Sequence, residues 1–379
     1  DILGEGNIRF VGGAVRDAII MLPVKDIDIA TILTPEEVTK RLTHHKIKVI
    51  PTGINHGTVT AVFGEHSFEI TTLRSDVSTD GRRAVVSYTT DWEEDAKRRD
   101  FTINALYCDE NGKIIDYFSG IADVLNGRIK FIGDANECIN EDALRILRFF
   151  RFNASHGKGE FDEAGLYACS KNAKKINILS GERIREEMFK LFLAKDNAKI
   201  IDEMQKSGVL KYIIPYKIDV LSLSRLDFSL YQPVQIKKEI VILALLIRSC
   251  DSDALKIAEI INERWKLSKR DYNNLLNLSI DKKNLQENLQ KNIRLLGKEI
   301  FSLHVLMNIA EGEDREMALK AIEFCNNWEI PIFPIKAEIL LERGIKADKN
   351  LGILLRKMEN FWEDSGYNVS IDEILSVVI

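Results

Sequence analysis

Residues 22–32, LPVKDIDIATI, place two aspartates inside what is otherwise a β-strand pattern. Side chains alternate between the two faces of a strand, so Asp26 and Asp28 should point to the same face. Aspartate is depleted in strands, and two neighbouring carboxylates repel each other. Such a pair fits either a solvated edge strand or a bound cation. An isolated D-x-D favours the edge strand, and only its surroundings can favour the cation.

A glycine pair upstream favours the cation. Gly12 and Gly13 end a predicted strand (IRFV) and open a predicted short helix (AVRDAIIM) that carries Arg16. Backbone N–H groups at such a turn can approach phosphate oxygens, and Arg16 is a candidate phosphate contact. Mg²⁺ prefers oxygen ligands and keeps open positions for phosphates. The combination therefore predicts a Mg²⁺-dependent phosphate site that contains Asp26 and Asp28.

A third carboxylate, Glu69 in FEITT, lies on a later predicted strand. It fits the same site and a solvent-facing strand position equally well.

Two further patterns predict local structure in this region. Residues 34–37, TPEE, have the form of a helix N-terminal capping box, and TVTAVF and SFEITTL read as a hairpin joined by GEH. The polar, Gly-containing stretch SDVSTDGRRA is predicted to be a mobile loop.

The sequence pattern becomes helical beyond Glu141, where apolar residues recur three and four positions apart. No convincing strand pair follows. The sequence thus predicts an α/β head with a small mixed sheet, followed by an all-α remainder. The 379 residues are enough for two or three domains, and 45% are hydrophobic with no apolar run of membrane-spanning length. We expect no membrane and no DNA partner, and the sequence leaves the oligomeric state open.

Charge and cysteine usage narrow the class of protein. The net charge of −5 argues against bulk nucleic-acid binding, yet residues 145–195 hold eleven basic and six acidic side chains, which allows a local basic surface. The five cysteines form no CxxC pair, and no secretory signal is recognisable. These features fit a reducing, cytoplasmic location without a zinc site.

The stretch EDALRILRFFR repeats charged residues at three-residue steps: Asp142, Arg145, Arg148 and Arg151. On one helix these would form a slowly turning stripe with Asp142 and Arg145 as neighbours. Ion pairs on a solvated face are the common explanation of such a stripe. The surrounding leucines and phenylalanines leave little solvated face, however, so the arginines need buried partners. The earlier stretch RRDF contains Arg99 and Asp100. Taken by itself, it would be interpreted as the charged end of a helix.

Together these motifs resemble the class II tRNA nucleotidyltransferase and poly(A) polymerase family. FVGGAVRDAIIMLPVKDIDIATI is similar to its first signature, KRRDFTINAL to its second, and NEDALRILRFFRF to its template signature, while SGERIREEMFKLF resembles a following helix. The match is specific to about residue 195 and most similar to CCA-adding enzymes of α-proteobacteria and mitochondria. It implies a nucleotidyltransferase head (1–133), a helical neck (134–195), and a helical body and tail that bind tRNA (196–379).

The resemblance implies an activity and a partner set. A CCA-adding enzyme of this family adds C, C and A from CTP and ATP to the 3′ end of tRNA without a nucleic-acid template, and releases pyrophosphate. Two Mg²⁺ ions would be held at Asp26 and Asp28, with Glu69 as a further catalytic carboxylate. Poly(A) polymerase activity and CC-only or A-only addition remain alternatives on the same motifs. A mitochondrial matrix location would apply in a eukaryote.

The resemblance also implies a role for each signature residue. Arg99 would contact the nucleotide phosphates together with Gly12, Gly13 and Arg16, and Asp100 would accept from the ribose 2′-hydroxyl. Asp142 and Arg145 would read the base edge, and Arg148 and Arg151 would hold phosphates or shape the pocket. The loop RSDVSTDGRRAVV (74–86) resembles the element linked to the switch from C to A. His56 is interpreted as a turn residue and not as a catalytic base.

Overall fold

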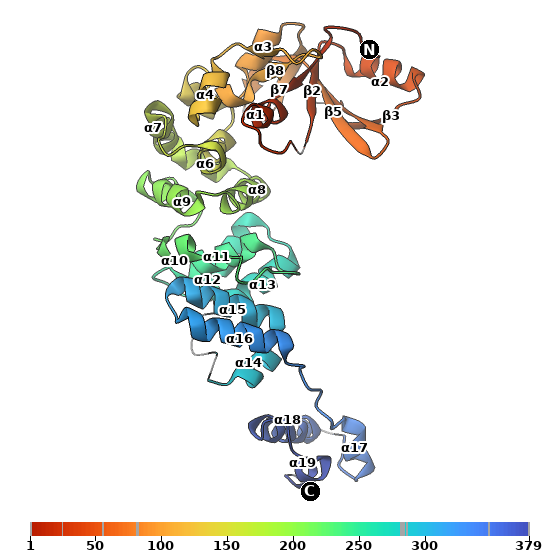
Figure 1. Cartoon of the computed structure of the whole chain (residues 1–379), viewed down its shortest axis with the longest axis vertical. Helices are drawn as coiled ribbons and strands as arrows, with labels where there is room; N and C mark the ends of the chain where they lie inside the picture. The colour runs from red at the N-terminus through yellow and green to blue at the C-terminus, as the bar shows by residue number, and fades with distance from the viewer. Residues whose placement is uncertain are drawn as a thin grey trace. The chain divides into compact units, whose positions relative to one another are not determined.

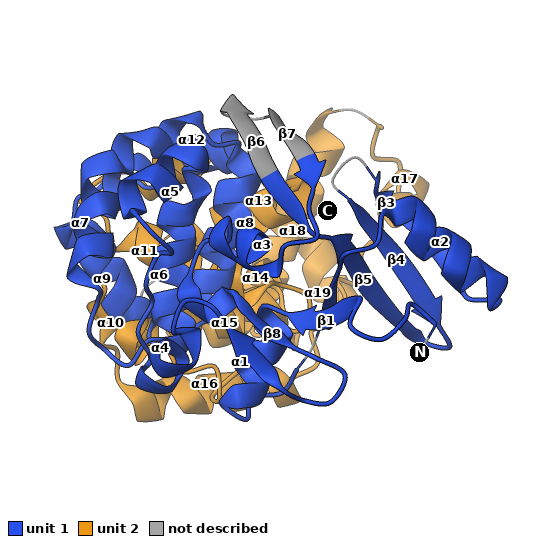
Figure 2. Ribbon diagram, turned by 90° about the horizontal axis from the view of Figure 1, so that it is seen from above, with its two compact units in different colours: residues 1–218, 260–266 blue, residues 219–259, 267–379 orange. Residues whose placement is uncertain are grey.

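The computed structural model describes residues 2–24, 26–54, 57–80, 83–280, 285, 287–347 and 349–377, and the side chains of residues 76–86 lie outside that description. His56 is therefore outside the described residues. The chain divides into two compact units, residues 1–218 with 260–266, and residues 219–259 with 267–379 (Figure 2). The first unit contains the mixed sheet (Figure 1). The predicted boundaries at residues 133 and 195 stay predictions.

The described strands form one mixed seven-stranded sheet and a separate two-stranded ribbon. The sheet order is β3-β4-β5-β2-β1-β8-β9, and β2 and β5 are its parallel neighbours. The strands are β1 (Ile8–Val11), β2 (Asp28–Thr31), β3 (Lys48–Gly53), β4 (Thr58–Phe63), β5 (His66–Thr72), β8 (Leu106–Cys108) and β9 (Ile114–Asp116). This confirms the small mixed sheet expected for the head.

The ribbon corrects one expectation. Strands β6 (Arg74–Asp80) and β7 (Arg83–Tyr88) pair antiparallel in the segment for which the sequence predicted a mobile loop. The stretch contains Val, Thr and Tyr, residue types that favour strands. The turn signals in the stretch suggested a loop, whereas the described residues on either side of them pair as strands.

The helices of the first unit begin between the strands of the sheet and continue after its last strand. They are α1 (Gly13–Ile19), α2 (Pro35–His44), α3 (Trp92–Lys97), α4 (Gly120–Asn126), α5 (Ala135–Glu141), α6 (Leu144–His156), α7 (Glu163–Asn172), α8 (Gly181–Phe192) and α9 (Asn197–Lys206), with 3₁₀ turns η2 (Thr102–Asn104), η3 (Ala173–Ile178) and η4 (Leu210–Tyr212). The stretch that contains RRDF forms α3, η2 and β8 in succession.

The regular elements of the second unit are all helices among its described residues, as the sequence predicted. Its helices are α10 (Leu221–Arg225), α11 (Lys238–Arg248), α13 (Lys269–Ser279), α14 (Leu289–Leu296), α15 (Lys298–Glu311), α16 (Arg315–Asn327), α17 (Ala337–Glu342), α18 (Lys349–Asp364) and α19 (Ile371–Ser376). Helix α12 (Ala254–Trp265) has residues in both units. None of the described helices is long and apolar enough to cross a bilayer.

Local sequence signals are confirmed where they are strong. Thr34 caps α2: its hydroxyl accepts from the Glu37 N–H, and the Glu37 carboxylate accepts from the Thr34 N–H. Strands β4 and β5 form the predicted hairpin. In both cases the signal depends on neighbours in sequence, so no distant contact is needed to produce it.

An aromatic cluster fixes α6 against the head. Phe101 forms a bridge to Phe131, and its ring lies 4.8 Å from that of Phe131 and 5.5 Å from that of Phe152. Phe149 stacks on Phe131 at 5.4 Å. Phe101 and Phe149 are completely buried, and each such side chain contributes about 2–3 kcal/mol by leaving water. The cluster therefore holds the arginine-bearing helix α6 at a fixed place beside the segment that carries Asp100.

Candidate active site

The paired aspartates lie at the start of a central strand. Asp28 is the first residue of β2, and its register partners are Val11 on β1 and Glu69 on β5. Asp26 precedes the strand, and both aspartates are exposed. Because β2 and β5 run parallel in this register, Glu69 lies directly beside Asp28. The sheet therefore places the third carboxylate next to Asp28, which the sequence could not decide.

The electrostatics of the pair favour a cation. Although Asp28 is exposed, the protein around its carboxyl displaces part of the water and so raises its pKa. The charge of Arg99 acts in the opposite direction, and repulsion from Asp26 adds to the rise. Among the described residues, neither aspartate forms an ion pair with Lys or Arg, and no group of three or more His, Cys, Asp or Glu side chains forms a metal site by itself. Two close carboxylates with spare oxygens fit a divalent ion that takes its remaining ligands from phosphates and water.

The glycine turn adjoins this pair. Gly12 has φ +70°, a left-handed conformation that favours glycine, and its N–H donates to the Leu106 carbonyl. Helix α1 begins immediately afterwards, and its buried Arg16 donates to the Asn104 side chain at 2.7 Å and to Asp17 at 2.8 Å. The turn thus fixes Arg16 close to the segment that carries Asp100.

These residues surround one pocket of about 540 Å³. It is lined by Gly12, Gly13, Arg16, Asp28, Arg74, Arg98, Arg99, Asp100, Asn104, Asp142, Arg145, Arg148, Arg151 and Phe152. Every predicted site residue except Asp26 and Glu69 is in the lining. Seven arginines face three aspartates, so the pocket attracts a polyanion. Its size suits a nucleotide, since ligand pockets typically measure about 300–1,000 Å³.

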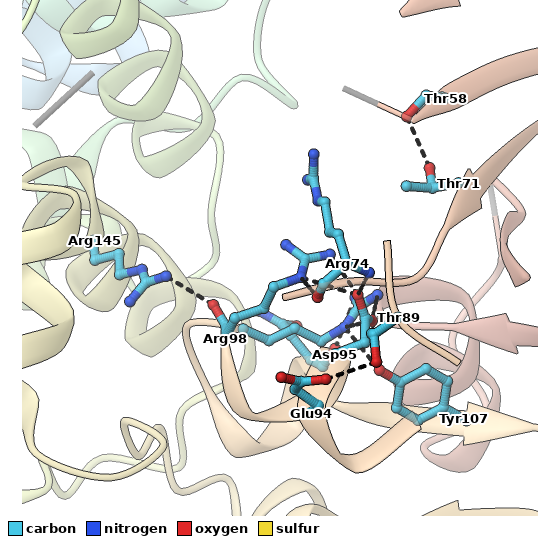
Figure 3. A network of polar contacts seen from close by, with 11 residues as sticks. Thr58, Thr71, Arg74, Thr89, Glu94, Asp95, Arg98, Tyr107 and Arg145 are labelled. Carbon is cyan, nitrogen blue, oxygen red and sulfur yellow. Dashed lines mark hydrogen bonds and ion pairs between the residues drawn. The ribbon is translucent and has the colours of Figure 1, made fainter. Parts of the chain in front are cut away.

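A buried carboxylate anchors one side of the pocket. The sequence did not single out Asp95, which accepts from Arg98 at 2.6 Å and from the Tyr107 hydroxyl at 2.7 Å (Figure 3). It also pairs with Arg99 at 3.1 Å. Burial raises the pKa of Asp95, but the charges of Arg99 and Arg98 and the hydrogen bond from Tyr107 outweigh it, so that the pKa is lowered. Asp95 therefore stays ionised and holds both arginines.

Asp100 is almost fully enclosed. Its Oδ1 accepts from the Phe101 N–H and the Asn104 amide, and its Oδ2 accepts from Arg148 at 2.6 Å. Burial raises the pKa of Asp100. The charge of Arg148 and these hydrogen bonds outweigh burial, so the pKa is lowered overall. A carboxylate has about four acceptor positions, so one position on Oδ2 is left for a hydroxyl. This capacity is compatible with the predicted ribose contact.

Glu187 on α8 provides the buried partner that the α6 arginines need. It lies 2.9 Å from Arg151 and 3.8 Å from Arg148, and it is 5% exposed. The sequence predicted that such partners must exist and did not identify this one. Its only signal was a position on the helix that resembles a family element. Glu187 and Asp100 together tie the α6 arginines to α8 and to the head segment.

The structure corrects the predicted helical stripe. Helix α5 ends at Glu141 and α6 begins at Leu144. Asp142 therefore lies between the two helices, with an extended backbone conformation. Its Oδ1 accepts from the Leu144 N–H at 3.0 Å, and its Oδ2 pairs with Arg183 at 2.7 Å. Asp142 and Arg145 are therefore not successive side chains on one helix, although both line the pocket.

Arg145 is also held by other partners. Its guanidinium donates to Glu141 at 2.7 Å, to the Cys138 carbonyl at 3.2 Å and to the Arg98 carbonyl at 2.8 Å (Figure 3). Of its five N–H donors, about two are left to face a ligand. Asp142 likewise keeps spare acceptor positions. The two side chains can thus present a donor and an acceptor to one planar ring.

Comparison with known proteins identifies the chain. Residues 8–130 match the family model of the poly A polymerase head domain, and residues 160–219 match that of a probable RNA and SrmB-binding site of polymerase A. The human protein named CCA tRNA nucleotidyltransferase 1, mitochondrial, is 34% identical over 98% of this chain and 86% of its own length. The chain belongs to the CCA-adding enzyme family of class II nucleotidyltransferases. These relatives assign CCA tRNA nucleotidyltransferase activity to it.

Solved structures share the fold of this chain. The CCA-adding enzyme of Bacillus stearothermophilus, crystallised with CTP, is 25% identical, with a TM-score of 0.80 over 95% of this chain and 89% of its own. A Thermotoga maritima CCA-adding enzyme, solved with tRNA, has the same fold at 20% identity, with a TM-score of 0.67 over 98% of this chain and 90% of its own. Nucleotidyltransferases of this family generally use divalent metal.

Proposed function

We propose that the chain adds C, C and A in turn to the 3′ end of tRNA, with CTP and ATP as nucleotide donors and Mg²⁺ as the metal ion. The observation that carries the residue roles is the pocket of about 540 Å³, which gathers three separate signature segments around one arginine-rich cavity. In the reaction, the 3′-oxygen of the tRNA bonds to the α-phosphorus of the nucleotide. The bond from that phosphorus to the pyrophosphate oxygen breaks.

The triphosphate lies on the arginine side of the pocket. Arg16 and Arg99 contact phosphate oxygens, with the backbone of Gly12 and Gly13 beside them. Arg148 and Arg151 are held by Asp100 and Glu187, so their guanidiniums keep a fixed place around the nucleotide. Such fixed charges stabilise the transferring phosphoryl group without reorganising during the reaction.

Asp26 and Asp28 would hold Mg²⁺, with Glu69 beside them as a further carboxylate. When bound, the ion would lower the pKa of the attacking hydroxyl and neutralise charge at the α-phosphate. Asp28 is the first residue of β2 and Asp26 lies just before it. Their exposure at the start of the strand leaves room for the tRNA terminus.

Base and sugar selection follow from the remaining pocket residues. Asp142 accepts from the exocyclic amine that C and A share, and Arg145 donates to a ring nitrogen or carbonyl. G and U present the opposite polarity there, which leaves groups unpaired. Asp100 accepts from the 2′-hydroxyl and so selects ribonucleotides.

The helices beyond residue 195 bind the tRNA through its backbone and shape, contacts that carry no sequence template. We further propose the predicted division into head, neck, and body with tail, and a cytoplasmic location, or the mitochondrial matrix in a eukaryote. Named relatives include mitochondrial and bacterial proteins.

The deciding experiment uses a tRNA transcript that lacks CCA and gives the protein labelled CTP alone, ATP alone, or both. If the protein adds CCA, the tRNA should gain two C residues with CTP alone. It should gain a single terminal A only when both nucleotides are present. Long A tails from ATP alone would identify poly(A) polymerase activity instead. Products that stop at CC with both nucleotides present would identify a CC-adding enzyme, and A added only to a tRNA ending in CC would identify an A-adding enzyme.

A further inference from the structure

Asp95 has a structural environment that no step described so far requires. It lies on the short helix α3, outside the lining of the nucleotide pocket, and its side chain is 1% exposed. A carboxylate buried to this degree is costly unless it is paired and hydrogen-bonded. Asp95 is fully partnered, and its charged partners are two arginines that do line the pocket.

The geometry around Asp95 aligns these two arginines. Arg98 donates through Nε at 2.9 Å and Nη2 at 2.6 Å to Oδ1, and Arg99 donates through Nε at 3.3 Å and Nη2 at 3.1 Å to Oδ2. Each guanidinium therefore uses one edge of its planar fork on Asp95. Within the described residues, Nη1 of Arg98 has no hydrogen bond and Nη1 of Arg99 has only a 3.5 Å contact with the Asn104 carbonyl.

The same carboxylate fixes the backbone at the base of the β6–β7 ribbon. The Arg74 N–H donates to Asp95 at 3.4 Å, and the Arg74 carbonyl accepts from Arg98 at 3.1 Å. On its other side, the Arg98 carbonyl accepts from Arg145 (Figure 3). Asp95 is thus linked to Arg74, the first residue of the ribbon, directly, and to Arg145 through Arg98.

We propose that Asp95 is a positioning residue that aims the free edges of Arg98 and Arg99 at the triphosphate of the incoming nucleotide. The proposal rests on the proposed function of the pocket. Asp95 itself touches no ligand in this arrangement and acts through the two arginines. Its effect on binding should therefore depend on the β- and γ-phosphates, since these are the groups that distinguish a triphosphate from a monophosphate.

The sign of the effect separates this role from a simple charge effect. Asp95→Asn removes a negative charge near the pocket, which by electrostatics alone would tighten the binding of CTP. Misaligned arginines would weaken it instead. Loss of one or two charge-assisted hydrogen bonds corresponds to roughly a tenfold or larger rise in Kd for CTP. The Kd for CMP should change by less than about threefold, since CMP lacks the distal phosphates.

The experiment measures Kd for CTP and for CMP with the full-length protein, wild type and Asp95→Asn. Glu93→Gln is the matched control, because Glu93 is an exposed carboxylate on the same helix. Tighter or unchanged CTP binding, or equal losses for CTP and CMP, would overturn the proposal. Tyr107→Phe changes no charge and removes the hydroxyl that donates to Asp95 and accepts from Arg99 Nε, so it should raise the CTP-to-CMP ratio of Kd values by a smaller factor than Asp95→Asn.

A double-mutant cycle adds a second readout. In an Arg98→Met/Arg99→Met background, Asp95→Asn should have little further effect on the Kd for CTP, because the groups it positions are gone. Additive losses would show a role independent of the arginines and so contradict the proposal. If Asp95→Asn does not fold, Tyr107→Phe carries the test, and an unchanged CTP-to-CMP ratio there refutes it. Wild-type addition to tRNA tests the proposed function separately.

Discussion

Replacing Asp142 by Asn is the sharpest test of base reading by side chains. The two residues have nearly the same shape, so the change converts one acceptor oxygen into an N–H₂ donor. The exocyclic amine of C or A then meets a donor, and the O4 carbonyl of U meets a partner it can use. We therefore expect selectivity to shift from CTP toward UTP, and not merely a slower reaction.

The magnitude follows from the contacts of Asp142. A hydrogen bond to a charged acceptor contributes about 1.5–3 kcal/mol, which corresponds to roughly tenfold to 150-fold in relative kcat/KM. The folding cost should be small, because the Asp142–Arg183 pair has side chains 35% and 45% exposed. Such a surface pair contributes about 0–1 kcal/mol to stability. Specificity and stability should therefore separate clearly.

The assay measures kcat/KM for CTP, ATP, UTP and GTP on a tRNA ready to receive each nucleotide. Arg183→Ala is a direct control, since it breaks the same ion pair and leaves the Asp142 carboxylate in place. Glu137→Gln on α5 is a control for charge, because Glu137 is exposed and outside the pocket lining. Equal losses for all four nucleotides, or the same shift in Arg183→Ala, would refute direct base reading by Asp142.

Four further outcomes are expected. Asp26→Ala or Asp28→Ala should abolish transfer with an unchanged melting profile, and retention of more than about a few per cent of wild-type kcat with Mg²⁺ present would contradict the metal role. Asp100→Ala should raise dCTP use relative to CTP, and an unchanged ratio of kcat/KM values would remove Asp100 from sugar selection. Deleting residues 75–82 should spare CC addition and block the final A, which gel analysis of the products would show. The pKa of Asp100 is lowered in the folded state, so its stabilising contribution should be complete above about pH 4 and decline as pH falls through the folded-state value; equal acid dependence of unfolding in wild type and Asp100→Asn would contradict it.

The sequence determined the parts of this protein that depend on near neighbours. The glycine turn before α1, the capping box of α2 and the β4–β5 hairpin are encoded within a few residues each, so their signals survive without any tertiary contact. The D-x-D pair raised a question that local rules could not answer, and such a conflict is what predicts a functional site there. Family resemblance then gave each signature residue its expected role.

Only the tertiary structure decided which distant residues share a surface. The parallel register of β2 and β5 brings Glu69 beside Asp28, and α8 brings Glu187 to the arginines of α6. Asp95 shows the reason most clearly. One acidic residue in a charged stretch looks like a solvated helix position until packing buries it, and burial then makes pairing with arginine an energetic requirement. Burial depends on the whole fold, and no short window of sequence contains it.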